Sequence, residues 1–237
     1  MTLAPWRQPP LTKEQEDDLF MLLLENDEED APWMVMGDLQ YWSASSLAHS
    51  LHNYALEQHL GWYVASMLPI YYPWPNVEEK KFLSPDLFVA FVDSHPRTSF
   101  DIEEEGGFPP FVLEVASASS TVRDLRIKRQ AYDLLGVREY VVFLPREERP
   151  STLEGYRRGT TGALEEWPVD EHGRLWSAVL NLYFEVHEQK VQARTAEGRL
   201  LLTPRQEAEA RRHAEDEVER LRRELQRYQR RDNGSVG

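Results

Sequence analysis

The sequence predicts an α/β protein in which a mixed sheet is flanked by helices. Three observations carry this prediction: the apolar strand Phe111–Val115, a helical pattern that runs to about Leu135, and a second apolar run at residues 140–144. Two strands joined by such a helix pair in parallel through a crossover connection. The hydrophobic share of 41% in 237 residues is enough for one core with an appendage.

Charge and composition narrow the classes of function. The formal net charge of -14 argues against a protein that coats duplexes regardless of sequence, because such proteins bind phosphates mainly with Lys and Arg. A basic groove on an acidic body is still compatible with nucleic-acid binding. The absence of cysteine excludes disulfides and cysteine-ligated zinc. Because the sequence shows neither a secretory signal nor an apolar run of about 18 residues, we expect a cytoplasmic protein without a membrane segment.

The first half of the chain begins with an acidic arm and continues with helical and strand patterns. Ser45 or Ser46 is the expected N-cap of the second helix, and Gly61 is its expected stop. The elements expected here are helices at residues 13–24 and 43–60, strands at 63–72 and 86–92, and a proline-rich loop at 93–110.

The second half opens with the strand Phe111–Val115, after which Ser117 to Thr121 offer several N-caps for a helix that Gly136 ends. Beyond the apolar strand at residues 140–144, short strands are expected at 153–156, 178–186 and 190–193. After Pro204 the apolar residues are spaced four, three, four and three apart, which is heptad spacing. The positions are Ala214, Val218, Leu221, Leu225 and Tyr228.

These patterns divide the chain into four parts. They are an acidic arm at residues 1–30, a core at 31–202, a coiled-coil-like helical extension at 203–231 and a disordered tail at 232–237. The extension is short for a coiled coil, so two alternatives stay open: it forms a homodimer or binds a partner protein, or it packs on its own core.

Glu114 is the residue that most needs an explanation. It lies in the middle of an apolar strand, where a carboxylate is costly to bury unless it is paired or binds a metal. Asp86 opens the preceding predicted strand, and a hairpin-like pairing of the two strands would bring it near Glu114. Together with the backbone carbonyl of Val115, the two carboxylates would offer a hard cation such as Mg²⁺ three oxygen ligands.

Two simpler explanations remain open for these carboxylates. Asp86 could cap a turn after Pro85, and Glu114 could pair with Arg123 or Arg126.

The helix after this strand carries Asp124, Lys128 and Tyr132 on one face, since they are spaced four apart. Lys128 could simply pair with Asp124, an interaction worth about 0.2 to 0.5 kcal/mol. Alternatively, its ammonium group could reach Glu114 and a scissile phosphate, where it would orient the attacking water or stabilise developing charge.

His49, His52 and His59 raise a different possibility, a metal hydrolase with histidine ligands. We expect them to be surface residues, because they lie on a helix separate from the paired carboxylates.

Taken in order, these motifs resemble one family. Ser-Pro-Asp86, Phe-Val-Leu-Glu114-Val, Asp124-x-x-x-Lys128-x-x-x-Tyr132 and Gly136-Val-Arg-Glu-Tyr140 are similar to those of the Uma-two family of restriction endonucleases, which belongs to the PD-(D/E)XK nuclease superfamily. The resemblance implies a restriction-endonuclease-like fold for the core, with Asp86 and Glu114 as metal ligands. The superfamily lysine is expected two residues after the glutamate, where this chain has Ala116, and Lys128 matches a lysine on the family's helix.

The expected function is therefore a Mg²⁺-dependent endonuclease that cuts phosphodiester bonds, with Mn²⁺ as a possible substitute and DNA as the expected substrate. In this hypothesis Asp86, Glu114 and Lys128 are catalytic, and Asp124 and Tyr132 support them. The alternative is an inactive nuclease fold that serves as a binding or assembly module through its C-terminal helix. Ala116 and the net charge of -14 favour that alternative.

Overall fold

The computed structural model describes residues 12–14, 17, 38–72, 81–116, 122–146 and 149–234, and it divides the chain into two compact units. The first unit is Met1–Leu201 and the second is Leu202–Gly237. Of the helix expected at residues 13–24, only Lys13, Glu14 and Asp17 lie within the described part, and all three are helical.

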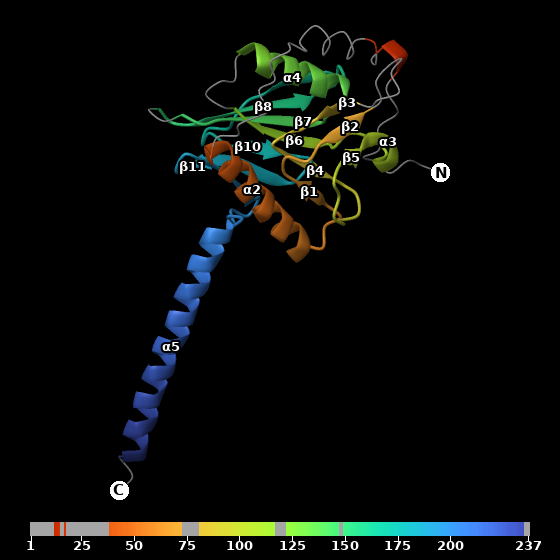
Figure 1. Ribbon diagram of the computed structural model, residues 1–237. Coiled ribbons are helices and arrows are strands. Elements are labelled where there is room, and N and C mark those ends of the chain that lie inside the picture. The colour runs from red at the N-terminus through yellow and green to blue at the C-terminus, as the bar shows by residue number, and fades with distance from the viewer. Residues whose placement is uncertain are drawn as a thin grey trace. The chain divides into compact units, whose positions relative to one another are not determined.

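The first unit is organised around a six-stranded mixed sheet with the strand order β1-β4-β6-β7-β8-β9 (Figure 1). Its strands are β1 (Tyr63–Ala65), β4 (Leu87–Ala90), β6 (Phe111–Val115), β7 (Glu139–Leu144), β8 (Thr152–Arg158) and β9 (Leu164–Trp167). Only β6 and β7 are parallel, and they are joined through α4 (Val122–Leu134). The predicted α/β class, the mixed sheet and the crossover are confirmed.

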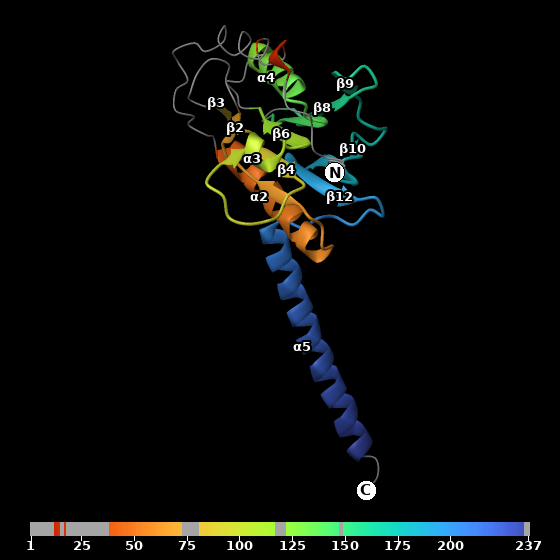
Figure 2. The same cartoon turned by 90° about the vertical axis from the view of Figure 1, so that its right-hand side faces the viewer.

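Helices α4 and α2 (Asp38–Glu57) cover opposite faces of this sheet (Figures 1 and 2). Strand β6 contributes side chains to the cores on both faces of the sheet, because successive side chains along a strand point in opposite directions. Leu113 and Val115 belong to the core beneath α2, whereas Val112 belongs to the core beneath α4. The face toward α4 is the one on which Glu114 also lies.

The described part of the unit also contains two smaller sheets. Strands β10 (Leu175–Ser177), β11 (Leu182–His187) and β12 (Lys190–Thr195) form an antiparallel sheet whose apolar side joins the core beneath α2. The fully buried rings of Phe111 and Phe184 stack there with centroids 5.0 Å apart. The other small sheet has the order β3 (Lys81–Leu83), β2 (Ile70–Tyr72) and β5 (Phe100–Asp101), and α3 (Ile102–Glu105) follows it.

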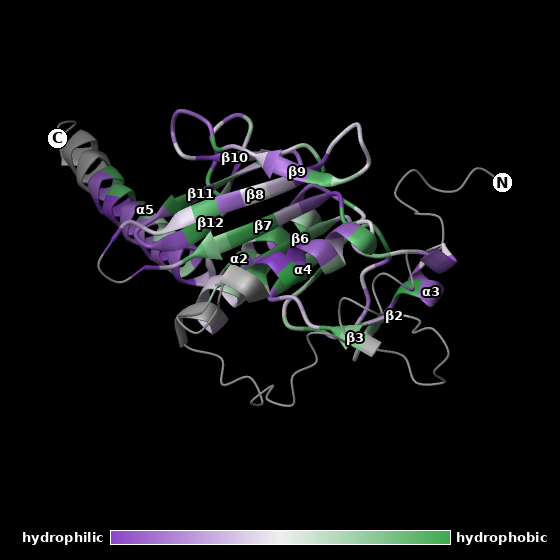
Figure 3. Ribbon diagram, turned by 90° about the horizontal axis from the view of Figure 1, so that it is seen from above, coloured by the Kyte–Doolittle hydropathy of each residue, from purple (hydrophilic) through white to green (hydrophobic). Residues whose placement is uncertain are grey.

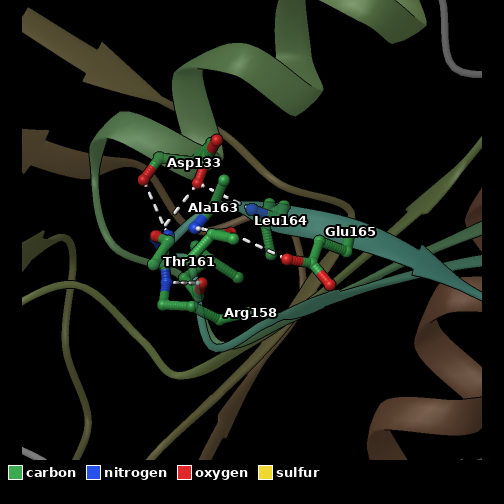
Figure 4. Close-up of polar contacts among 8 residues, drawn as sticks. Asp133, Arg158, Thr161, Ala163, Leu164 and Glu165 are labelled. Carbon is green, nitrogen blue, oxygen red and sulfur yellow. Dashed lines mark hydrogen bonds and ion pairs between the residues drawn. The ribbon is translucent and has the colours of Figure 1, made fainter.

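The C-terminal end of α4 is fastened to the β8–β9 hairpin by polar contacts (Figure 4). Asp133 Oδ1 accepts the backbone N–H of Leu164 at 3.0 Å and pairs with Arg158 Nη1 at 3.0 Å, and Arg158 Nη2 donates to the Asp133 carbonyl at 2.7 Å. Gly136 then adopts the left-handed conformation with φ of 81°, which ends the helix as the sequence predicted. These contacts fix the height and rotation of α4 over the sheet.

Four local predictions were wrong. The strand expected at residues 178–186 begins in the turn between β10 and β11. The single strand expected at residues 63–72 is two strands in different sheets, because the chain turns at Met67, whose N–H bonds to the carbonyls of Pro85 and Asp86. The helix expected from residue 43 begins at Asp38, so Ser45 and Ser46 are not N-caps; buried Ala44 extends its apolar face toward the N-terminus. The proline-rich segment at 93–110 contains β5 and α3 rather than loop alone.

The second unit consists of α5 (Pro204–Gly234), a continuous helix of 31 residues (Figure 1). It begins with a capping box in which Gln206 Oε1 accepts the N–H of Thr203 at 2.9 Å and Thr203 Oγ1 accepts the N–H of Gln206 at 3.4 Å. The helix extends three residues into the segment expected to be disordered.

None of the helices in the described ranges combines the length and the apolarity that crossing a bilayer requires.

Replacing Phe184 with alanine should lower the free energy of unfolding by about 3–5 kcal/mol, because it opens a cavity where β11 packs against Phe111. The measurement is denaturant unfolding followed by tryptophan fluorescence. Val169→Ala is the control, since Val169 is 42% exposed; its effect should stay within about 0.5 kcal/mol. Equal losses in both variants would contradict the packing of the two sheets.

Candidate active site

The β4–β6 register sets two carboxylates against each other. The antiparallel partners are Leu87 with Leu113, Phe88 with Val112 and Val89 with Phe111. Asp86 immediately precedes Leu87 and Glu114 immediately follows Leu113, so a continuation of this register would set the two residues opposite each other on one face of the sheet. Both side chains are buried, with exposed fractions of 4% for Asp86 and 2% for Glu114.

Asp86 is held by hydrogen bonds on both its side chain and its backbone. Its Oδ2 accepts the N–H of Val115 at 2.7 Å, so the carboxylate takes a place that a strand carbonyl would otherwise fill. Its carbonyl accepts Ser66 Oγ at 2.8 Å and the N–H of Met67 at 3.3 Å. The turn between β1 and β2 therefore helps to fix Asp86.

Glu114 is bound from above by two side chains of α4. Lys128 Nζ lies 2.9 Å from Oε2, and the Tyr132 hydroxyl donates to Oε1 at 2.5 Å. Lys128 and Tyr132 are four residues apart and so lie on one face of the helix. Lys128 keeps 40% of its side chain exposed while its ammonium group touches a buried carboxylate, so it connects the buried pair with solvent.

The electrostatics of the pair are those of two acids that have too little compensating charge. The pKa of Asp86 is raised from 3.8 to about 7, mainly by burial and then by the negative charge of Glu114, against the opposing effects of the Val115 N–H and Lys128. The two carboxyl groups are also close enough to share a hydrogen bond. Burial next to Glu114 lifts the pKa of Tyr132 well above its usual value, so its hydroxyl remains a donor.

Tyr140 is a residue of this site that the sequence reasoning missed. It lies on β7 beside Val112, its ring centroid is 5.0 Å from that of Tyr132, and it is fully buried. Burial and the charges of Glu114 and Asp86 raise its pKa well above the usual value. Within the described residues its hydroxyl has no hydrogen-bond partner. The sequence offered one indication of its role: Tyr140 brings a hydroxyl group into the otherwise apolar run of β7.

The remaining predicted positions are placed less fully. Val115 contributes its N–H to Asp86, and its carbonyl stays a predicted ligand. Ala116 follows at the end of β6, where its N–H bonds to the Phe143 carbonyl at 2.8 Å. The side chain of Asp124 lies outside the described part, as does that of Arg123, while Arg126 is exposed.

The histidines are not part of this site. His49 and His52 lie on α2, on the opposite face of the sheet from α4, and His49 Nε2 contacts Asn53 at 2.9 Å. Across the described ranges, no group of three or more His, Asp or Glu side chains is arranged to hold a metal ion. The described part thus offers a pair of carboxylates, which suits an ion such as Mg²⁺ that completes its shell with waters and phosphate oxygens.

Comparison of the sequence with known protein families identifies the family of this chain. The family model Uma2, described as "Putative restriction endonuclease", matches residues 32–187. The chain belongs to the Uma2 family. The matched stretch contains Asp86, Glu114, Lys128 and Tyr132, and the resemblance inferred from the sequence motifs is confirmed.

A crystal structure from Anabaena variabilis, described as "a putative nuclease belonging to DUF820", is similar over 59% of this chain and 70% of that chain, with 14% identity and a TM-score of 0.40. No protein with curated annotation matches the sequence.

The raised pKa of Asp86 predicts a specific pH dependence of stability in the presence of a chelator. Between about pH 4 and 7 the unfolded chain releases this proton and the folded chain keeps it, so the free energy of unfolding falls as the pH rises. The slope should approach about 1.4 kcal/mol per pH unit. Asp86→Asn keeps the acceptor for Val115 and should remove this slope, as measured by urea unfolding from pH 4 to 8.

Asp93→Asn, at an exposed position after β4, is the matched control and should leave the slope unchanged. An Asp86→Asn variant with the same slope as the parent protein would show that Asp86 titrates normally.

Proposed function

We propose that this protein is a divalent-metal-dependent endonuclease that hydrolyses phosphodiester bonds, with DNA as substrate and Mg²⁺, or Mn²⁺ in its place, as cofactor. The observation that carries the proposal is the buried pair of Asp86 and Glu114 next to the Leu87–Leu113 pairing, with the Lys128 ammonium group 2.9 Å from Glu114. The family of the chain is in line with nuclease chemistry.

The pair fits a divalent cation on chemical grounds. Burial and the negative charge of Glu114 raise the pKa of Asp86, so the pair carries negative charge that its neighbours do not offset, which favours a bound cation. Asp86 and Glu114 would hold the ion, and the Val115 carbonyl is a further candidate. Such an ion lowers the pKa of a bound water and neutralises charge on the phosphate.

The side chains of α4 support the reaction in different ways. Tyr132 fixes the orientation of Glu114 through its short hydrogen bond. Lys128 supplies from the helix the ammonium group that Ala116 cannot supply from the strand, and it can stabilise negative charge on a phosphate oxygen next to Glu114. In this proposal the catalytic lysine is positioned by α4 and not by the alternation of side chains along β6.

Helix α4 also supplies local positive charge on an acidic protein. Its 13 residues include four cations, namely Arg123, Arg126, Lys128 and Arg129, against the two carboxylates of Asp124 and Asp133. The chain as a whole has a net charge of -14. A phosphodiester backbone would therefore be attracted to the α4 side of the sheet, the side on which Glu114 lies.

A second candidate function is an inactive nuclease fold that acts as a binding or assembly module. The observation that favours it is the internal pairing of the site, since Lys128 and Tyr132 occupy Glu114 and the Val115 N–H occupies one oxygen of Asp86. This candidate expects neither metal binding nor cleavage.

Cleavage of supercoiled plasmid DNA at low salt tests the first candidate. Asp86→Asn and Glu114→Gln keep the size of each side chain but remove its charge, and each should slow Mg²⁺-dependent cutting by more than about 100-fold. Glu139→Gln is the matched control. Glu139 is also a buried glutamate, with 1% exposure, but it lies outside the site and pairs with Arg157, whose Nε is 3.0 Å from its Oε1. Cutting that persists in both site variants would refute the assignment.

Metal binding gives a readout that does not depend on the right substrate. At pH 8 and saturating Mn²⁺ the melting temperature should rise, because ligand at 100 times its Kd adds about 2.7 kcal/mol to stability. Asp86→Asn should lose this rise. Lys128→Ala should keep or strengthen it, since an ammonium group that competes for Glu114 is removed, while cutting slows.

Lys190→Ala, on the exposed start of β12, is the control for removing a lysine. If Mn²⁺ raises the melting temperature of the parent protein and of Asp86→Asn equally, the ion binds elsewhere.

A further inference from the structure

We propose that α5 pairs with α5 of a second copy as a parallel, in-register coiled coil, so that the protein is a homodimer. The proposal does not depend on nuclease activity.

The helix carries an exposed apolar stripe. Val218, Leu221 and Leu225 have exposed fractions of 47%, 50% and 57% in the chain as described. In Figure 3 the coloured part of α5 is otherwise largely hydrophilic. A helix of this kind gains little from its own residues, because most helical stability in proteins comes from packing an apolar face. Burial of the stripe against a partner surface would therefore stabilise the helix.

The spacing of the stripe specifies what kind of surface fits. Ala214, Val218, Leu221, Leu225 and Tyr228 occupy positions d, a, d, a and d of a heptad repeat. A stripe with this spacing packs against another helix with the same spacing. The central layers have Val218 at position a and Leu221 at position d, and a β-branched residue at a with leucine at d favours two parallel strands.

The charges beside the stripe are complementary between two parallel copies. Glu217 lies at position g and Arg222 at position e, which face each other across a parallel dimer, once on each side. Among the described residues Arg222 makes no ion pair, whereas Arg220 pairs with Glu217 at 2.6 Å and Arg223 pairs with Glu219. An antiparallel pair with Val218 over Leu221 would instead oppose Glu217 to Glu224.

The distribution of net charge favours association through α5. The helix has nine arginines against eight acidic residues, so two copies hardly repel one another. The remainder of the chain has 18 basic and 33 acidic residues. Two such acidic bodies repel each other, which makes the helix the surface best suited to bring two copies together.

Disulfide trapping is a direct test, because the chain contains no cysteine. In a parallel, in-register pair the two Leu221 positions face each other, so Leu221→Cys should form a covalent dimer on mild oxidation. Arg223→Cys, at the outward position f of the same heptad, is the matched control and should stay largely uncrosslinked. The parent protein should show twice its chain mass of 27.7 kDa by light scattering.

Charge reversal tests the pairing itself. Glu217→Arg and Arg222→Glu should each weaken self-association by about tenfold, since each places like charges across the interface. An equimolar mixture of the two variants should associate better than either alone. A monomeric parent protein, or equal trapping at positions 221 and 223, would overturn the proposal, and circular dichroism would verify that the helix persists.

Discussion

The buried pair of Asp86 and Glu114 is the constraint on which the geometry around α4 depends. Two carboxylates with 4% and 2% exposure are costly to bury, and the surrounding contacts lower that cost. The Val115 N–H binds Asp86, while Lys128 and Tyr132 bind Glu114. The Val115 contact constrains the β4–β6 register, and the Lys128 and Tyr132 contacts constrain the position of α4. The turn after β1 is constrained separately, through the bonds of Ser66 and Met67 to the Asp86 carbonyl. The residual charge, seen in the raised pKa of Asp86, is what a cation would neutralise.

The position of α4 matters because it determines what Lys128 can reach. Arg158 and Asp133 tie the end of the helix to the β8–β9 hairpin, and the left-handed Gly136 returns the chain to β7. Asp133 directly follows Tyr132 in α4, so a displaced helix end would move Lys128 away from Glu114. A charge supplied from a helix thus depends on packing far along the chain, whereas a lysine at position 116 would be placed by strand alternation alone.

What could be predicted from the sequence followed from local patterns. The period of two in Phe111–Val115, the stop at Gly136 and the heptads after Pro204 each correspond to an element of the structure. The proximity of Asp86 to Glu114 followed from the assumed hairpin-like pairing. The break at Met67 could not be predicted, because its left-handed φ of 56° is stabilised by bonds to Pro85 and Asp86 from a distant segment. Whether Lys128 reaches Glu114 could not be decided either, since it depends on the anchor at Arg158.

Dimerisation through α5 would affect how a nuclease of this kind cuts a duplex. A parallel coiled coil has twofold symmetry, and so do the backbones of an antiparallel duplex about a local axis. Two copies joined through α5 would bring two Asp86–Glu114 sites into one assembly, one for each strand. Because the bodies are acidic, their approach to one duplex would need the cations of α4 and a metal ion at each site. Self-association would then decide whether nicks or double-strand breaks accumulate.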